Sequence, residues 1–315
     1  MTPDAVYPEY APAGTAASLH ELIALRERVA GGACPARLSP APGAHASSRL
    51  GRGMEFAEVR PYQAGDDVRS IDWRQTARRG RPYTKLFQEE RGRALRILVD
   101  LGPSMRFGTR VAFKSVIAAR AAALLAWMAH AGGDRVGGVV WNGDARREMH
   151  AHADRHGTLE LLRCIAQASA EAPADGESHM TAPLRSLARM LQPGSLAVLV
   201  SDFTALDDAA AHEISLLARR AELALVQVYD TFEAEAPAGR YRLTDGKRSA
   251  TLDLRTAEAR AAHGAAFARR CSHLQALARR CRATLLPLAT NDPLEAMLRQ
   301  AFPALPGPRS TDCQP

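Results

Sequence analysis

Several features that mark particular protein classes are missing from this sequence. Its five cysteines include no CxxC pair, and their odd number excludes a complete disulfide framework, so we expect a reducing compartment. No uncharged apolar run reaches the ~18 residues that a membrane-spanning helix needs. The first residues combine neither a basic region nor an apolar stretch, so we expect no signal peptide, no membrane insertion and a cytoplasmic location.

Familiar catalytic motifs are missing as well. The chain contains no GxSxG, no HExxH and no GxxxxGK[ST] pattern. These absences argue against serine hydrolases of the α/β type, zinc peptidases and P-loop nucleotidases. No nucleophile with an accompanying base is visible, and we therefore expect a protein that is not an enzyme.

The composition is that of an ordinary globular protein with a basic surface. Hydrophobic residues make up 46% of the chain and charged residues 24%, which is enough apolar material for a sizeable core. The net charge is +7 and the isoelectric point is near 9.5. A positive charge permits anionic partners, but an arginine-rich solvated surface explains it equally well.

Short apolar runs alternate with helical patterns through most of the chain. Alternation of this kind predicts an α/β fold with a doubly wound, mostly parallel sheet. We expect a flexible N-terminus with one helix (1–45), a strand and loop extension (46–92), the sheet domain (93–302) and a loose tail (303–315). The expected core strands are 95–99, 135–141, 195–200, 223–229 and 284–288, with an edge strand at 147–150, a hairpin at 240–254, and helices at 16–30, 111–131, 159–170, 181–191, 209–220, 257–281 and 293–301.

Three of the apolar strands end on aspartates, the last of them on Asp230. Asp100 closes the first strand and is followed by Ser104, Asp202 closes a later one, and Ser178 lies in a polar loop between them. In open α/β sheets ligands bind beyond the carboxyl ends of the strands, and hard oxygen donors suit Mg²⁺ or Mn²⁺. The alternative is that these aspartates cap helices or bind loop amides, and the pattern alone leaves both interpretations open.

The segment from Arg49 to Arg96 is dense in charge, with twelve Lys/Arg against seven Asp/Glu. Its basic part, Arg69 to Arg96, is a candidate for nucleic-acid binding. Because the arginines are interleaved with acids and aromatic residues are few, a solvated loop with internal ion pairs is the favoured interpretation.

One stretch of this segment resembles a known family signature. Residues 55–78, EFAEVRPYQAGDDVRSIDWRQTAR, resemble the signature of the bacterial domain-of-unknown-function family fifty-eight. The resemblance continues at 87–91, 100–105, 133–137 and 230–233, and covers about residues 45 to 300. The signature residues are Glu55, Phe56, Arg60, Tyr62, Gly65, Asp66, Asp67, Arg69, Asp72, Trp73, Arg74 and Arg78.

This resemblance implies a von Willebrand factor A-like domain and a metal-ion-dependent adhesion site. Such a site uses Asp-x-Ser-x-Ser, then a Thr, then an Asp. Asp100 corresponds to the first Asp, Ser104 to the second Ser, Ser178 to the Thr and Asp202 to the last Asp. Gly102 stands in place of the first Ser, so the site is degenerate, and any Mg²⁺ would bind with water in place of that ligand.

The resemblance also implies a class of partner. Proteins of this family are typically encoded beside MoxR-type AAA+ ATPases and are thought to act as their partners or adaptors. We therefore expect a non-enzymatic adaptor that works with such an ATPase and docks partners, including a client protein, at the strand-end edge. The alternatives are a metal-dependent hydrolase using Asp100 and Asp202, and nucleic-acid binding through Arg69 to Arg96.

Overall fold

The computed structural model describes residues 14–30, 54–62, 71, 73–89, 93–143, 145–171, 179–244 and 249–303. The chain divides into two compact units, one made of residues 1–35 with 93–315 and the other of residues 36–92. Predicted site residues that lie outside the described residues are Gly65, Asp66, Asp67, Arg69, Asp72 and Ser178.

The larger unit contains a six-stranded sheet. Its order is β10-β7-β6-β3-β4-β5, and each neighbouring pair is parallel except β4 with β5. This arrangement confirms the predicted doubly wound, mostly parallel α/β fold. The strands are β3 (Ala94–Asp100), β4 (Arg135–Trp141), β5 (Arg146–His152), β6 (Leu196–Ser201), β7 (Glu222–Tyr229) and β10 (Thr284–Ala289).

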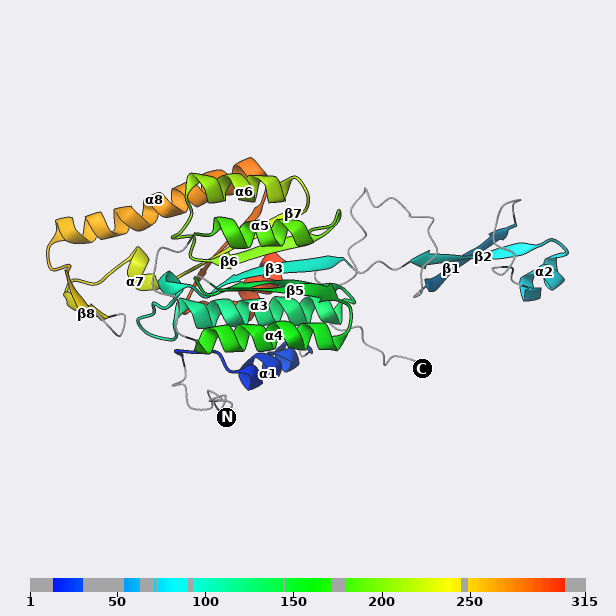
Figure 1. The fold of residues 1–315 in the computed structure, drawn as a ribbon, viewed down its shortest axis with the longest axis horizontal. Coiled ribbons are helices and arrows are strands. Elements are labelled where there is room, and N and C mark those ends of the chain that lie inside the picture. Colours follow the sequence, from blue (N-terminus) through cyan, green and yellow to red (C-terminus); the bar gives the residue numbers. More distant parts are fainter. Residues whose placement is uncertain are drawn as a thin grey trace, which may run out of the picture. The chain divides into compact units, whose positions relative to one another are not determined.

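Helices cover both faces of this sheet (Figure 1). Side chains of β3 alternate between the faces, so that Ile97 joins one core cluster and Leu98 the other. One face carries α1 (Leu19–Ala30), α3 (Lys114–Ala131), α4 (Arg155–Ala170) and α9 (Leu294–Ala301), and the other carries α5 (Thr181–Met190), α6 (Asp208–Ala218) and α8 (Ala257–Cys281). In the described part of the chain, no helix combines the length and apolar character needed to span a bilayer.

The helix α1 belongs to this larger unit. The sequence-based division at residue 45 sets it apart from the sheet, whereas in the structure it packs against α3 and α4. Leu22 and Val29 are buried in the same core cluster as α3. The indole Nε1 of Trp127 donates a hydrogen bond of 3.0 Å to the Leu22 carbonyl oxygen. An amphipathic helix this short is stabilised mainly by such tertiary packing, which local sequence does not reveal.

The smaller unit contains two antiparallel strands, β1 (Met54–Pro61) and β2 (Tyr83–Glu89), with the helix α2 (Trp73–Arg79) between them in sequence. Both strands lie within the strand and loop extension expected at 46–92. The signature residue Trp73 begins α2 and is 67% exposed. Of the other signature residues, Glu55, Phe56 and Arg60 lie in β1, Tyr62 is partly buried, and Arg74 and Arg78 are exposed on α2.

Short elements follow the carboxyl ends of the strands. A turn of 3-10 helix, η2 (Pro103–Met105), follows β3, and the single-turn helix α7 (Thr231–Ala234) follows β7. The hairpin of β8 (Arg240–Thr244) and β9 (Ser249–Asp253) confirms the prediction at 240–254. These loops hold the polar groups of the candidate site.

Candidate functional site

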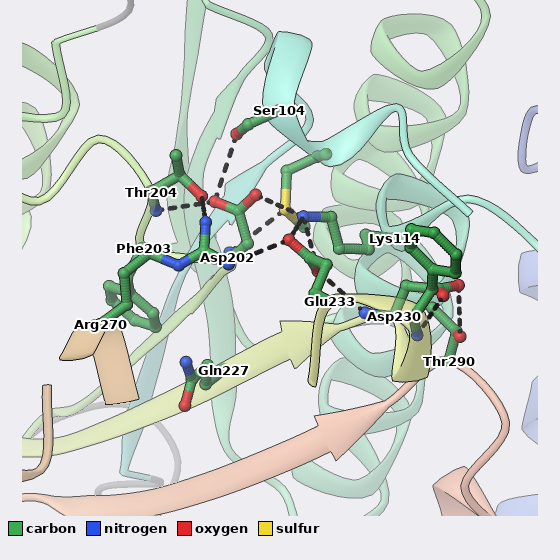
Figure 2. A network of polar contacts seen from close by, with 12 residues as sticks. Ser104, Lys114, Asp202, Phe203, Thr204, Gln227, Asp230, Glu233, Arg270 and Thr290 are labelled. Atoms are coloured by element: carbon green, nitrogen blue, oxygen red, sulfur yellow. Dashed lines mark hydrogen bonds and ion pairs between the residues drawn. The ribbon is translucent and has the colours of Figure 1, made fainter. Parts of the chain in front are cut away.

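The carboxyl ends of β3 and β6 bring three of the predicted residues together. The two strands are hydrogen-bonded neighbours, so Asp100 at the end of β3 lies beside the residues that follow β6. The hydroxyl of Ser104, carried by η2, donates to Asp202 Oδ1 at 3.2 Å (Figure 2). The structure therefore brings three of the four predicted site residues together, while Ser178 lies outside the described residues.

Asp100 is buried, and both of its carboxylate oxygens accept hydrogen bonds from neighbouring groups. It is 2% exposed; its Oδ1 accepts from the Gly102 amide at 2.9 Å and its Oδ2 from the Ser201 hydroxyl at 2.6 Å. Burial, and then the negative charge of Asp202, raise the pKa of Asp100 to about 7, against the opposing effect of these hydrogen bonds. Near neutral pH Asp100 therefore carries a proton for much of the time.

Asp202 has the opposite electrostatic environment. Its Oδ1 also accepts from the Thr204 amide at 2.9 Å, because Phe203 adopts a left-handed φ of 55° between them. Its Oδ2 accepts from the Lys114 ammonium at 2.7 Å. Burial acts to raise the pKa of Asp202, but the charge and hydrogen bond of Lys114, with those from Thr204 and Ser104, hold that pKa below its ordinary value. Of the two aspartates, Asp202 is the fixed anion.

Lys114 is the central residue that sequence reasoning missed. It opens α3, is only 2% exposed, and its Nζ lies 2.7 Å from Asp202 Oδ2 and 3.1 Å from Glu233 Oε2. A lysine is almost never buried so completely unless it is paired. The signal in the sequence is a lysine at the start of a mostly apolar helix whose other ionisable residues are Arg120 and His130.

Glu233 connects this lysine to the neighbouring elements. It lies in α7, where its Oε2 accepts from the Asp230 amide at 3.0 Å and completes a capping box. Arg270 of α8 donates to Glu233 Oε1 at 3.2 Å and to the Thr204 hydroxyl at 3.4 Å. Figure 2 shows the result, a continuous network through the β6 loop, α3, α7 and α8.

A second buried carboxylate lies nearby at the end of β7. Asp230 is fully buried and accepts four hydrogen bonds, from the Thr109 amide and hydroxyl, the Phe232 amide and the Thr290 hydroxyl, at 2.6–3.1 Å. Burial acts to raise its pKa, but these donors, led by the Thr109 hydroxyl, hold the pKa of Asp230 below its ordinary value. Asp230 is therefore a structural carboxylate whose hydrogen bonds come from neutral groups.

The residues present do not fit the divalent metal that the family resemblance implies. Gly102 offers no side-chain oxygen, and a Cβ built there would lie 3.1 Å from Asp100 Oδ1. A divalent ion on Asp202 would stand close to the Lys114 ammonium, and at an effective dielectric of ~20 their repulsion is on the order of several kcal/mol. Among the residues that the structure describes, no three His, Cys, Asp or Glu side chains converge as a metal-ligand group.

Comparison with known proteins places the chain among proteins of undetermined function. The uncharacterized proteins Rv1480 of Mycobacterium tuberculosis (strain H37Rv) and Mb1516 of Mycobacterium bovis are each 33% identical to it over 258 residues, covering 79% of this chain and 78% of theirs.

Two solved structures match part of this chain at low sequence identity. BatB from Bacteroides thetaiotaomicron has a TM-score of 0.45 and 15% identity, over 68% of this chain and 98% of that one. A von Willebrand factor type A protein from Catenulispora acidiphila has a TM-score of 0.38 and 12% identity, over 71% of this chain and 43% of that one.

The family model described as "Protein of unknown function DUF58" matches residues 58–273. This match spans the end of β1, the strand-end carboxylates, Lys114, Glu233 and most of α8. It also spans five of the six strands of the larger sheet. The family match and the 33% identical relatives lead to one conclusion: this chain belongs to the DUF58 family.

Proposed function

We propose that this chain is a non-enzymatic adaptor that docks partner proteins at its strand-end face. We define the strand-end face by its exposed side chains, which are Pro103, Thr109, Arg110, Val111 and Thr204. The observation that carries this proposal is that Asp100, Asp202, Glu233 and Asp230 all accept hydrogen bonds or ion pairs from within the chain. Their carboxylates brace the loops, so none of these four groups is left free to act as an acid or base on a substrate.

The composition of the strand-end face suits protein contact. Val111 is 53% exposed, which is unusual for a large apolar side chain in this structure, and it follows the exposed Arg110. Arginine beside apolar surface is typical of protein interfaces. The loops that bear these residues are fixed from below by the buried network, so a partner would meet a preorganised surface.

The proposed partner is a MoxR-type AAA+ ATPase. Support for it comes from the family resemblance, since the described residues contain no feature that names a partner. In this scheme the ATPase supplies energy and the adaptor supplies a recognition surface for the ATPase or for a client protein.

A capture experiment tests this proposal with a matched pair of charge reversals. The immobilised chain should retain the MoxR-type ATPase of its own organism in the presence of Mg²⁺ and ATP. Arg110→Glu on the strand-end face should abolish retention. Arg219→Glu changes another exposed arginine, just after α6 and so at the opposite end of the strands, and this variant should retain the ATPase fully. Failure of the wild-type chain to retain the ATPase with ATP, ADP or no nucleotide would refute the partnership.

The two alternative functions have less support. A hydrolase using Asp100 and Asp202 needs a carboxylate that reaches substrate, but both are buried and engaged. For nucleic-acid binding, the end of the basic segment is unsuitable, because Arg93 pairs with Glu222 and Arg96 is 5% exposed. We therefore do not propose either activity.

A further inference from the structure

We infer that the Lys114 ammonium occupies the cation position of the strand-end site, so that this site is completed by an internal charge and binds neither Mg²⁺ nor Mn²⁺. The inference concerns the site alone and does not depend on the docking proposal. It predicts that the lysine occupies this position permanently.

The first support is the placement of the ammonium. Lys114 Nζ lies between two carboxylates, 2.7 Å from Asp202 and 3.1–3.2 Å from Glu233. Its side chain is 2% exposed and that of Asp202 is 3% exposed, so neither can turn to solvent without opening the site. Three elements far apart in sequence, the start of α3, the loop after β6 and α7, supply the three groups (Figure 2).

The second support is that neighbouring groups fix the position of the Lys114 side chain at both of its ends. The Phe107 ring lies 5.9 Å from Nζ, and Phe107 also packs on Phe232 of α7. The Phe107 carbonyl accepts from the Lys114 amide at 2.8 Å, which fixes where α3 begins. The lysine is therefore held at its base by the backbone and at its tip by two acids.

The third support is the loss of metal-binding groups on the Asp100 side. Gly102 contributes its amide, an N–H donor, to Asp100 Oδ1, where a metal ion would need an oxygen. A Cβ added at Gly102 would lie tight against that same oxygen, at 3.1 Å. The local backbone is thus arranged to donate to Asp100 and not to coordinate a cation beside it.

The direct test consists of two measurements. The first is a titration with Mn²⁺ alone, in which the electron paramagnetic resonance signal of the free ion reports binding. The second is thermal unfolding in millimolar MgCl₂. The wild-type chain should show no saturable Mn²⁺ site and no change in Tm. Lys114→Met removes the ammonium and leaves the carboxylates of Asp202 and Glu233 facing one position. That variant should gain one saturable Mn²⁺ site, and Mn²⁺ should raise its Tm by several degrees.

Two further variants control for non-specific effects. Arg120→Met removes a partly buried cation from the same helix, where it pairs with Glu21 away from the site, and should gain no Mn²⁺ binding. Lys114→Met combined with Asp202→Asn should lose the Mn²⁺ site gained by the single variant.

Several outcomes would overturn the inference. A saturable Mn²⁺ site in the wild-type chain that disappears in Asp202→Asn would overturn the inference, whatever the lysine variants show. A folded Lys114→Met chain that binds no Mn²⁺ would also overturn it. If Lys114→Met does not fold, Lys114→Gln, which keeps a hydrogen-bond donor without the charge, takes its place in the same measurements.

Discussion

Two neighbouring strands of this sheet end on buried aspartates that are stabilised in different ways. Asp202 follows β6 and depends on the Lys114 ammonium, whereas Asp230 follows β7 and depends on amides and hydroxyls of neutral residues. In sequence both are the same pattern, an apolar strand ending on an aspartate. The pattern therefore locates a buried carboxylate but does not reveal what neutralises it.

The difference matters because the two environments respond differently to a lost partner. Asp230 accepts from four neutral donors, and three remain when one is removed. Asp202 and Glu233 share one buried cation, and its removal leaves two carboxylates without their central charge. Breaking a buried ion pair is among the most destabilising single changes known in proteins.

The largest expected effect is that of Lys114→Met. It should lower the free energy of unfolding by about 3–5 kcal/mol, because Asp202 stays buried without its cation and Glu233 keeps only Arg270. Urea unfolding followed by circular dichroism measures this change. Arg120→Met on the same helix should cost no more than ~1 kcal/mol, since its pair with Glu21 is partly exposed. Similar losses of unfolding free energy in both variants would show that the burial of Lys114 does not strengthen its ion pairs.

The second prediction concerns pH and compares Asp100 with Asp202. The pKa of Asp100 is raised to about 7 in the folded chain, so between pH 4 and 7 the folded state holds a proton that the unfolded state releases. The contribution of Asp100 to the free energy of unfolding therefore decreases as pH rises through this window, by up to roughly 4 kcal/mol. Asp202, whose pKa is lowered, contributes stability above pH 4 that is lost only at lower pH.

Asp100→Asn should remove that pH dependence. Measured from pH 4 to 8, the variant should show a flatter stability profile than the wild-type chain, and the difference between them should grow in the variant's favour as pH rises. Asp202→Asn should instead flatten the profile below pH 4. An unchanged slope between pH 4 and 7 in Asp100→Asn would mean that Asp100 is already ionised there.

A smaller effect is expected at the Asp230 cluster. Thr109→Val keeps the shape of the side chain and removes one hydroxyl donor from the carboxylate, which should cost about 1.5–3 kcal/mol. Thermal unfolding would detect this as a fall in Tm. A loss as large as that of Lys114→Met would contradict the view that the remaining neutral donors sustain Asp230.

The smallest effect is expected for Arg270→Met. Arg270 pairs with Glu233 as the outer cation of the network, but its side chain is 36% exposed. Exposed ion pairs contribute no more than ~1 kcal/mol, so the variant should be nearly as stable as the wild-type chain. If instead it matched Lys114→Met, the network would be acting as one unit, and a double-mutant cycle between the two positions would measure that coupling.

The sheet could be predicted because its strands are buried on both faces. Such strands appear in sequence as continuous apolar runs, and the expected strand at 195–200 differs from β6 (Leu196–Ser201) by one residue at each end. The start of α3 was placed three residues early, at 111. The apolar pattern extends to that point, but the bond from the Lys114 amide to the Phe107 carbonyl keeps the preceding residues in a loop.

The core of the site could be predicted only in part. Asp100, Ser104 and Asp202 belong to a local motif and to strand ends, so their meeting followed from topology. The pairing of Lys114 with Glu233 joins residues 119 positions apart, and no periodicity connects them. The capping box of Asp230 and Glu233 was readable as an Asp followed three residues later by a Glu, but it did not show that the glutamate would also face a lysine.

The arrangement of the two units has a consequence for the covalent continuity of the chain. Because α1 packs within the larger unit, residues 36–92 form an insertion whose two ends both return to that unit. A single cut by a protease within this insertion would produce two fragments without separating them. Leu22, Val29 and the bond from Trp127 would keep the N-terminal fragment attached, and the nicked protein would migrate as one species until it is denatured.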